Sequence, residues 1–195
     1  MAGIDVTRAF VPLRIAVLTV SDTRAPADDK SGATLSERIK AAGHIVVERT
    51  IVQDDVEAIR ARVKEWIDAP AVDVIITTGG TGFTGRDVTP EAVEPLFEKR
   101  MDGFSIAFHM LSHAKIGAST VQSRATAGVA GATYIFCLPG SPGACRDAWD
   151  EILVHQLDYR FRPCNFVEIM PRLDEHLKRD KARPVPTKKR TAGVG

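Results

Sequence analysis

The sequence predicts an α/β fold in which a mostly parallel β-sheet is covered by helices on both faces. Apolar runs and segments of helical periodicity alternate at least four times along the 195 residues, which is the order of elements in such folds. The first run, RIAVLTVSD, is short, continuous and rich in β-branched residues, as expected for a buried strand. Loop-forming or acidic residues follow the runs, and ligands of parallel sheets bind at those strand ends.

Four apolar runs are predicted to be strands. The first ends in SDTR, the second in QDD, the third in GGTGFTGRD and the fourth in PGSPG. Since the carboxyl ends of parallel strands lie at one edge of a sheet, these four segments are expected to face a common pocket. The predicted strands occupy residues 14–22, 45–52, 72–78 and 132–139.

Five segments are predicted to be helical. In the second of them the apolar residues recur on a single helical stripe. Ser31, Thr89 and Ser141 are expected to be N-caps, and Pro90 suits the first position of its helix. The predicted helices occupy residues 31–44, 54–67, 89–99, 104–111 and 141–157.

The length suits one domain with short extensions. We predict an N-terminal arm at 1–13, a ligand-binding domain at 14–172 and a basic C-terminal tail at 173–195. The tail is interpreted as a solvated extension, with a binding arm as the alternative.

Charge and composition exclude several classes of partner. A net charge of +1 provides no overall field that would favour nucleic acid or a membrane surface. The apolar runs are too short to cross a bilayer, and the start of the chain lacks the features of a signal peptide. The three cysteines form no CxxC pair and are expected to be reduced thiols, which predicts a cytoplasmic protein.

The segment TTGGTGFTGRDVTPEA, residues 77–92, comes close to two known phosphate loops. It contains GxGxxG, but it follows the third strand and its helix is expected only at Pro90, whereas a dinucleotide fingerprint opens the helix within the motif. It also has the glycine spacing of a P-loop, but Arg86 and Asp87 stand where Lys and Ser or Thr are required. Both of these motif assignments therefore fail.

The same segment still has the properties of an anion site. Its glycines let backbone N–H groups approach a phosphate closely, and Arg86 adds a planar cation. Asp87 offers a hard oxygen ligand for Mg²⁺, while Thr89, Pro90 and Glu91 open a helix whose N-terminus favours anions. The competing interpretation is a tight strand-to-helix turn without a ligand.

A series of short motifs occurs in order along the chain: RIAVLTVSD, SG, AGH, GGTG, RDVTPEA, GF, QSRATAGV and LPGSP. Together they resemble the MoaB/MogA molybdopterin-binding family, which also includes gephyrin-type fusion proteins and the amino-terminal half of CinA-like proteins. The resemblance covers about residues 12–172, and the carboxyl half is similar to the MoaB branch.

The resemblance implies a three-layer α/β fold that assembles as a trimer, or as a hexamer in the MoaB branch. It implies molybdopterin as ligand and, for MogA-type members, adenylyl transfer: the terminal phosphate of molybdopterin attacks the α-phosphorus of ATP, with Mg²⁺ as cofactor. Other molybdenum cofactor biosynthesis proteins are implied as possible partners.

The resemblance also implies which residues form the site. Two acidic family positions, catalytic and Mg²⁺-binding, fall on Asp54 and Asp87. Relatives often read V-P-D-E where this chain reads VQDD, so Asp55 is a neighbouring candidate, and helix capping is an equal interpretation of Asp54. The implied substrate-binding residues are Ser21, Thr78, Gly79, Gly80, Thr81, Gly82, Arg86, Thr89, Pro90, Glu91, Ser123, Arg124, Pro139, Gly140 and Ser141.

Three functions are compatible with this resemblance. Some MoaB proteins lack the Arg-Asp-Val-Thr pattern and do not adenylylate, whereas this chain keeps RDVTPE, which favours a molybdopterin adenylyltransferase. A non-catalytic carrier of molybdopterin is the first alternative. A CinA-like nucleotide pyrophosphatase domain is the second, although that branch has a long carboxyl-terminal extension.

Overall fold

A computed structural model describes residues 2–175, and it contains the predicted mostly parallel sheet. Four parallel strands are followed at one edge by two strands that join through antiparallel pairings, in the order β3-β2-β4-β7-β6-β5. This arrangement confirms the predicted α/β class. The strands are β2 (Arg14–Val20), β3 (Ile45–Val52), β4 (Val74–Thr78), β7 (Thr133–Leu138), β6 (Thr126–Ala130) and β5 (Lys99–Arg100).

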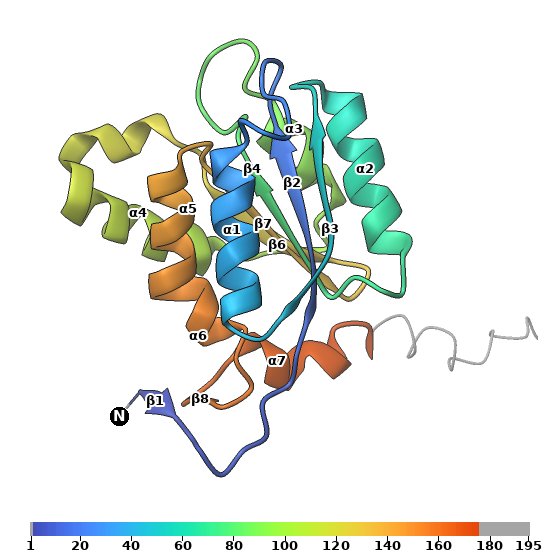
Figure 1. Cartoon of the computed structure of the whole chain (residues 1–195), viewed down its shortest axis with the longest axis vertical. Helices are drawn as coiled ribbons and strands as arrows, with labels where there is room; N and C mark the ends of the chain where they lie inside the picture. The colour runs from blue at the N-terminus through green and yellow to red at the C-terminus, as the bar shows by residue number, and fades with distance from the viewer. Residues whose placement is uncertain (1, 176–195) are drawn as a thin grey trace, which may run out of the picture.

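Helices cover both faces of this sheet, which gives three layers (Figure 1). On one face lie α1 (Lys30–Ala41), α4 (Asp102–Ile116) and α5 (Pro142–Ala148), and their apolar residues share one core cluster. On the other face lie α2 (Val56–Asp68) and α3 (Thr89–Val93), which share the second cluster.

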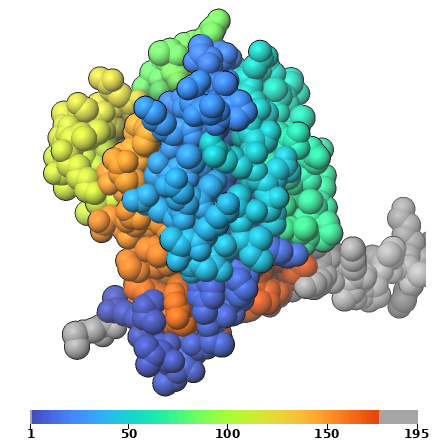
Figure 2. All heavy atoms as spheres, viewed as in Figure 1, coloured from blue at the N-terminus to red at the C-terminus, as the bar shows by residue number. Residues whose placement is uncertain are grey.

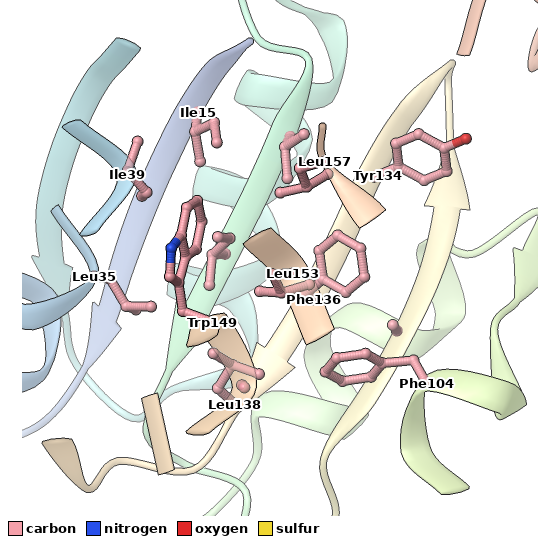
Figure 3. Packing of buried hydrophobic residues seen from close by; sticks show 14 of the residues in the cluster. Ile15, Leu35, Ile39, Phe104, Tyr134, Phe136, Leu138, Trp149, Leu153 and Leu157 are labelled. Carbon is pink, nitrogen blue, oxygen red and sulfur yellow. The ribbon is translucent and has the colours of Figure 1, made fainter. Parts of the chain in front are cut away.

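The strands separate the two clusters by simple alternation. In β2, Ile15 and Val17 belong to the first cluster, while Ala16 and Leu18 belong to the second. The first cluster contains most of the buried rings, and Phe104 of α4 packs edge-on against Phe136 of β7 with 5.1 Å between ring centroids (Figure 3). Both faces of the central strands are therefore fixed by side-chain packing.

Within the main sheet, two strands were not predicted, and the helix between them and β4 ends earlier than expected. The helix expected at 89–99 ends at Val93, and a 3₁₀ turn (Glu94–Leu96) and then β5 follow. Pro95 lacks the N–H that a continuing α-helix needs, which is a physical reason for the early end. β6 was not predicted because its sequence, TAGVA, is rich in small residues of low β-propensity.

The last helical segment is longer and less regular than α5 alone. A π-helical turn (Trp149–Leu153) follows α5 and leads into α6 (Val154–Gln156). Ser141 caps this segment by accepting from the Ala144 N–H at 3.1 Å, so that predicted cap is confirmed.

The predicted caps Ser31 and Thr89 are wrong. Asp29 caps α1 by accepting from the Gly32 N–H at 2.9 Å, and α1 begins at Lys30, before Ser31. Val88 occupies the cap position of α3, and no side chain bonds there. The hydroxyl of Thr89 instead donates to the Gly79 carbonyl at 2.9 Å.

The predicted arm contains a short strand, β1 (Gly3–Ile4), which pairs with β8 (Phe161–Arg162). Arg8 adds a hydrogen bond from its guanidinium to the Tyr159 carbonyl at 2.8 Å. A 3₁₀ helix, η2 (Gly117–Gln122), follows α4, and α7 (Phe166–Ile169) and another 3₁₀ turn (Met170–Arg172) precede the end of the described chain. The predicted tail beyond residue 175 lies outside the described residues.

Cys137 and Cys145 are buried, Cys164 is exposed, and all three are free thiols. Within residues 2–175 no helix has the length and apolar character needed to span a bilayer.

Candidate functional site

A cavity of about 510 Å³ lies where the parallel strands end. The loops after β2, β3, β4 and β7 all contribute to it, and they gather at the top of the view in Figure 1. Its lining includes most of the predicted site residues, namely Ser21, Asp54, Gly79, Gly80, Thr81, Gly82, Arg86, Asp87, Ser123, Pro139, Gly140 and Ser141. The sequence therefore placed these residues together correctly, while their roles stay predictions.

Asp54 and Asp55 have different positions, although they are neighbours. Asp55 is the N-cap of α2 and accepts from the Ala58 N–H at 2.9 Å. Asp54 points to the glycine loop instead, where its Oδ1 accepts from the Val88 N–H at 3.2 Å. Asp54 lines the cavity and Asp55 does not, so the geometry selects Asp54 as the candidate acid.

The carboxylate of Asp54 is in an unfavourable electrostatic environment. Burial raises its pKa above the usual value, and the nearby carboxylates of Asp87 and Asp22 raise it further. The Val88 N–H and Arg86 act in the opposite direction and do not compensate fully. A cation bound beside Asp54 would relieve this repulsion.

Asp87 is held by its own loop. Its Oδ2 accepts from the backbone N–H and the hydroxyl of Thr84, at 2.8 and 2.6 Å. Burial raises the pKa of Asp87, but the hydrogen bonds from Thr84 and from the Gly82 N–H outweigh it and lower the pKa overall. Asp87 is therefore an ionised, preorganised carboxylate on the cavity wall.

Two glycines shape the loop between the acids. Gly79 and Gly80 have φ values of 105° and 62°, in the region that favours glycine. A Cβ on Gly80 would lie 2.7 Å from Oδ1 of Asp54 and would also collide with the Thr89 hydroxyl. The missing side chain leaves space for Asp54, and Thr89 secures the loop by bonding to Gly79.

Five predicted binding residues do not line the cavity: Thr78, Thr89, Pro90, Glu91 and Arg124. Thr78 donates to the Pro139 carbonyl at 2.9 Å and so joins β4 to the PGSP loop. Arg124 donates to the carbonyls of Gly82 and Asp87, at 2.9 and 2.7 Å, and also pairs with Glu91. Arg124, together with Thr89 through its bond to the Gly79 carbonyl, therefore holds the glycine loop from outside the cavity.

Sequence reasoning missed Asp22 and Arg24 in the loop after β2. Asp22 accepts from Arg86 at 2.7 Å and from the Asp54 N–H at 3.1 Å. Arg24 donates to the Gly140 carbonyl at 3.0 Å. The available signal was their place in SDTR, directly after a predicted strand.

The donor set fits Mg²⁺. Among residues 2–175 there is no cluster of three or more Asp, Glu, His or Cys that could enclose a metal ion. Mg²⁺ in phosphate-transfer sites is commonly held by one or two carboxylates together with water and substrate phosphates. Asp54 and Asp87, separated by a loop without bulky side chains, provide such a pair.

A second hollow of about 570 Å³ adjoins the cavity along β3. The two share Ser21, Asp22 and Arg24. The two are similar in size, but the second hollow contains neither the glycine loop nor the predicted acids, so the first is the candidate functional site.

Fold and site together define a class: three-layer α/β proteins that present a glycine loop and two carboxylates at the end of a parallel sheet. A family model described as a probable molybdopterin binding domain matches residues 16–159. The chain belongs to this molybdenum cofactor biosynthesis family.

Individual relatives agree with this assignment. The chain is 52% identical over 162 residues to molybdenum cofactor biosynthesis protein B of Escherichia coli strain K12, covering 83% of this chain and 95% of that protein. A crystal structure of a molybdenum cofactor biosynthesis protein B has a TM-score of 0.77 and 39% identity, covering 86% of this chain and 99% of that one. A structure of MogA has a TM-score of 0.66 and 33% identity, over 74% and 97% of the two chains.

Proposed function

We propose that this protein binds molybdopterin and adenylylates it with Mg²⁺ and ATP. The observation that carries the proposal is the pairing of Asp54 and Asp87 across the glycine loop in one cavity. Family membership supports molybdopterin as the ligand. The intact RDVTPE segment and the preorganised Asp87 support catalysis in addition to binding.

The reaction needs no nucleophilic side chain from the protein. A phosphate oxygen of molybdopterin attacks the α-phosphorus of ATP, a new P–O bond forms, and the bond to the pyrophosphate leaving group breaks. The protein has to hold two polyanions together, and such positioning contributes about 7–11 kcal/mol in favourable cases. The two adjoining hollows supply space for both substrates.

Each part of the cavity has a distinct task in this scheme. Asp54 and Asp87 would hold Mg²⁺, which when bound neutralises charge on the phosphates. Backbone N–H groups of the glycine loop and the guanidinium of Arg86 would bind phosphate oxygens. Ser123 and Ser141, from other segments of the wall, would orient the ligands.

We also propose that the protein works as a homo-oligomer, a trimer or hexamer. α4 has apolar residues on both faces: Phe104 and Phe108 are buried in the core, whereas Ile106 and Met110 are 62% and 69% exposed. Ile116 and Val121 extend this apolar surface, and Figure 2 shows the segment, in yellow, standing out from the body. Covering such a surface with another copy is the usual role of an exposed apolar patch.

The location and further partners are part of the same proposal. A cytoplasmic protein would meet ATP and Mg²⁺ directly. Its product would pass to another protein of molybdenum cofactor biosynthesis for metal insertion.

The test of the enzyme is turnover of molybdopterin by purified protein with ATP and Mg²⁺. Asp87→Asn keeps the shape but removes the charge, so adenylylation should fall by about two to three orders of magnitude. Binding of molybdopterin should be retained, because the loop N–H groups and Arg86 are unchanged. Tight binding without any product in the wild-type protein would reject catalysis and leave the non-catalytic carrier.

Light scattering tests the assembly. A monomer at micromolar concentration would contradict the oligomer, and Met110→Glu should weaken association because it places a charge on the exposed apolar surface. The exposed Glu57, on α2, offers a control as Glu57→Gln, which should leave association unchanged.

A further inference from the structure

The three arginines around the cavity differ in how many hydrogen bonds hold their side chains. Arg124 makes three side-chain hydrogen bonds and its side chain is 26% exposed. Arg24 donates to the Gly140 carbonyl and to Ser31, at 3.0 and 3.3 Å. Arg86 makes a single side-chain hydrogen bond within residues 2–175, to Asp22, and its side chain is 78% exposed. Arg86 is therefore the guanidinium that can change partner at least cost.

Asp22 connects Arg86 to the candidate acid. One of its oxygens, Oδ2, accepts from Arg86 at 2.7 Å, and the other, Oδ1, accepts from the backbone N–H of Asp54 at 3.1 Å. The side chain of Asp22 is 28% exposed, and it lines the cavity. A single carboxylate thus joins the loops that follow β2, β3 and β4.

We propose that Asp22 is a positioning residue that keeps Arg86 at the mouth of the cavity and yields it to a phosphate group of the entering substrate. The assignment of that phosphate to a nucleotide or pterin rests on the proposed function. The exchange is possible because a phosphate can offer the planar cation two oxygens, whereas Asp22 offers it one, Oδ2. Asp22 keeps its bond to the Asp54 N–H throughout, so the acid stays in place.

This arrangement makes the cavity selective for polyanions. Every anion has to compete with Asp22 for Arg86 and also meets the negative charge of Asp54 and Asp87, so an anion that makes a single contact gains too little to bind. A pyrophosphate group carries more charge and can contact the glycine loop and Arg86 together. The exposed Asp22–Arg86 pair is weak enough to be displaced, since such pairs contribute at most about 1 kcal/mol, which corresponds to a factor of about five.

The test is a double-mutant cycle of inorganic pyrophosphate binding, measured by calorimetry in EDTA. Asp22→Asn should tighten binding about two- to fivefold because Arg86 is released. The asparagine can still accept from the Asp54 N–H, so the loop should keep its shape. Arg86→Gln should weaken binding, and adding Asp22→Asn to it should then change affinity much less than in the wild-type background.

Asp28→Asn is the matched control, because Asp28 lies in the same loop, is exposed and does not line the cavity. It should leave pyrophosphate affinity unchanged. Equal tightening by Asp22→Asn with and without Arg86 would overturn the proposal, since Asp22 would then act only as a negative charge. Absence of pyrophosphate binding to both the wild-type protein and Asp22→Asn would also overturn it.

The cycle uses neither molybdopterin nor Mg²⁺, so it is independent of turnover. Coupling between Asp22 and Arg86 in a protein that makes no adenylylated product would reject the enzyme and keep this inference. Turnover in a protein without coupling between Asp22 and Arg86 would keep the enzyme and reject this inference.

Discussion

Asp29 and Asp54 are two carboxylates at the same edge of the sheet with opposite surroundings. Asp29 is 1% exposed and fully satisfied: its oxygens accept from Thr19, Arg49 and the Gly32 N–H at 2.8 to 2.9 Å. Among residues 2–175, Asp54 accepts a single hydrogen bond, from the Val88 N–H, and it lies near the carboxylates of Asp22 and Asp87. Asp29 is buried and paired, whereas Asp54 is half-buried and has few partners. Burial and partners together distinguish a carboxylate that holds the fold from one that is available to a ligand.

The largest expected effect is the loss of stability when the Asp29 carboxylate is removed. Asp29→Ala leaves the buried hydroxyl of Thr19 and the Gly32 N–H at the start of α1 without their partner, and it removes the ion pair with the partly exposed Arg49. The free energy of unfolding should therefore fall by about 2–4 kcal/mol. Urea unfolding measures it. Asp54→Ala is the matched variant and should change stability by less than about 1 kcal/mol. Similar losses of stability in both variants would show that the two carboxylates contribute equally to the fold.

The next expected effect is a loss of turnover that distinguishes Asp54 from Asp55. Asp54→Asn should reduce adenylylation by about two to three orders of magnitude with little change in stability. Asp55→Ala should instead lower the free energy of unfolding by about 1 kcal/mol, because α2 loses its N-cap. It should leave turnover unchanged, because Asp55 does not line the cavity. Turnover assays and urea unfolding of both variants provide the check, and lost turnover in Asp55→Ala would assign the catalytic role to Asp55.

The smallest effect is a difference in pH dependence. The raised pKa of Asp54 means that the folded chain binds this proton more tightly than the unfolded chain. Asp54 therefore favours folding at low pH, and this contribution is lost as the pH rises from about 4 through the folded pKa. The lowered pKa of Asp87 acts in the opposite direction, with a contribution present above about pH 4 and lost as the pH falls through the folded value.

Unfolding free energies from about pH 3 to pH 7 test both signs. Relative to the wild-type protein, Asp54→Asn should gain stability as the pH rises, whereas Asp87→Asn should lose it. Parallel curves for the two variants would show that their environments do not differ.

Local signals account for what the sequence predicted well. Three of the four parallel strands are mainly apolar runs, and β3 has apolar residues at both ends of IVVERTIV. The loops after the four strands contain glycine, proline and acidic residues that mark the strand ends. β6 was missed because its pairing depends on distant residues: Gly128 lies so close to the Phe97 ring that a Cβ would collide with it. A strand of this kind is defined by its neighbours and gives little signal of its own.

The candidate site was likewise predictable only where its residues are close together in the sequence. Asp87 and the glycine loop were identifiable because they are contiguous in the sequence. The choice between Asp54 and Asp55 depended on a hydrogen bond to Val88, 34 residues away, and the pair of Asp22 with Arg86 spans 64 residues. Such contacts between loops appear only when the strands bring the loops to one edge.

The pairing of β1 with β8 has a consequence for how this domain can be used in larger proteins. Gly3 and Ile4 lie beside Arg162 and Phe161, at the base of the fold and away from the cavity (Figure 1). A module attached before β1 would begin at this base, on the side away from the cavity mouth. The fold is therefore suited to tandem architectures, in which another domain shares the polypeptide without the cavity being rebuilt.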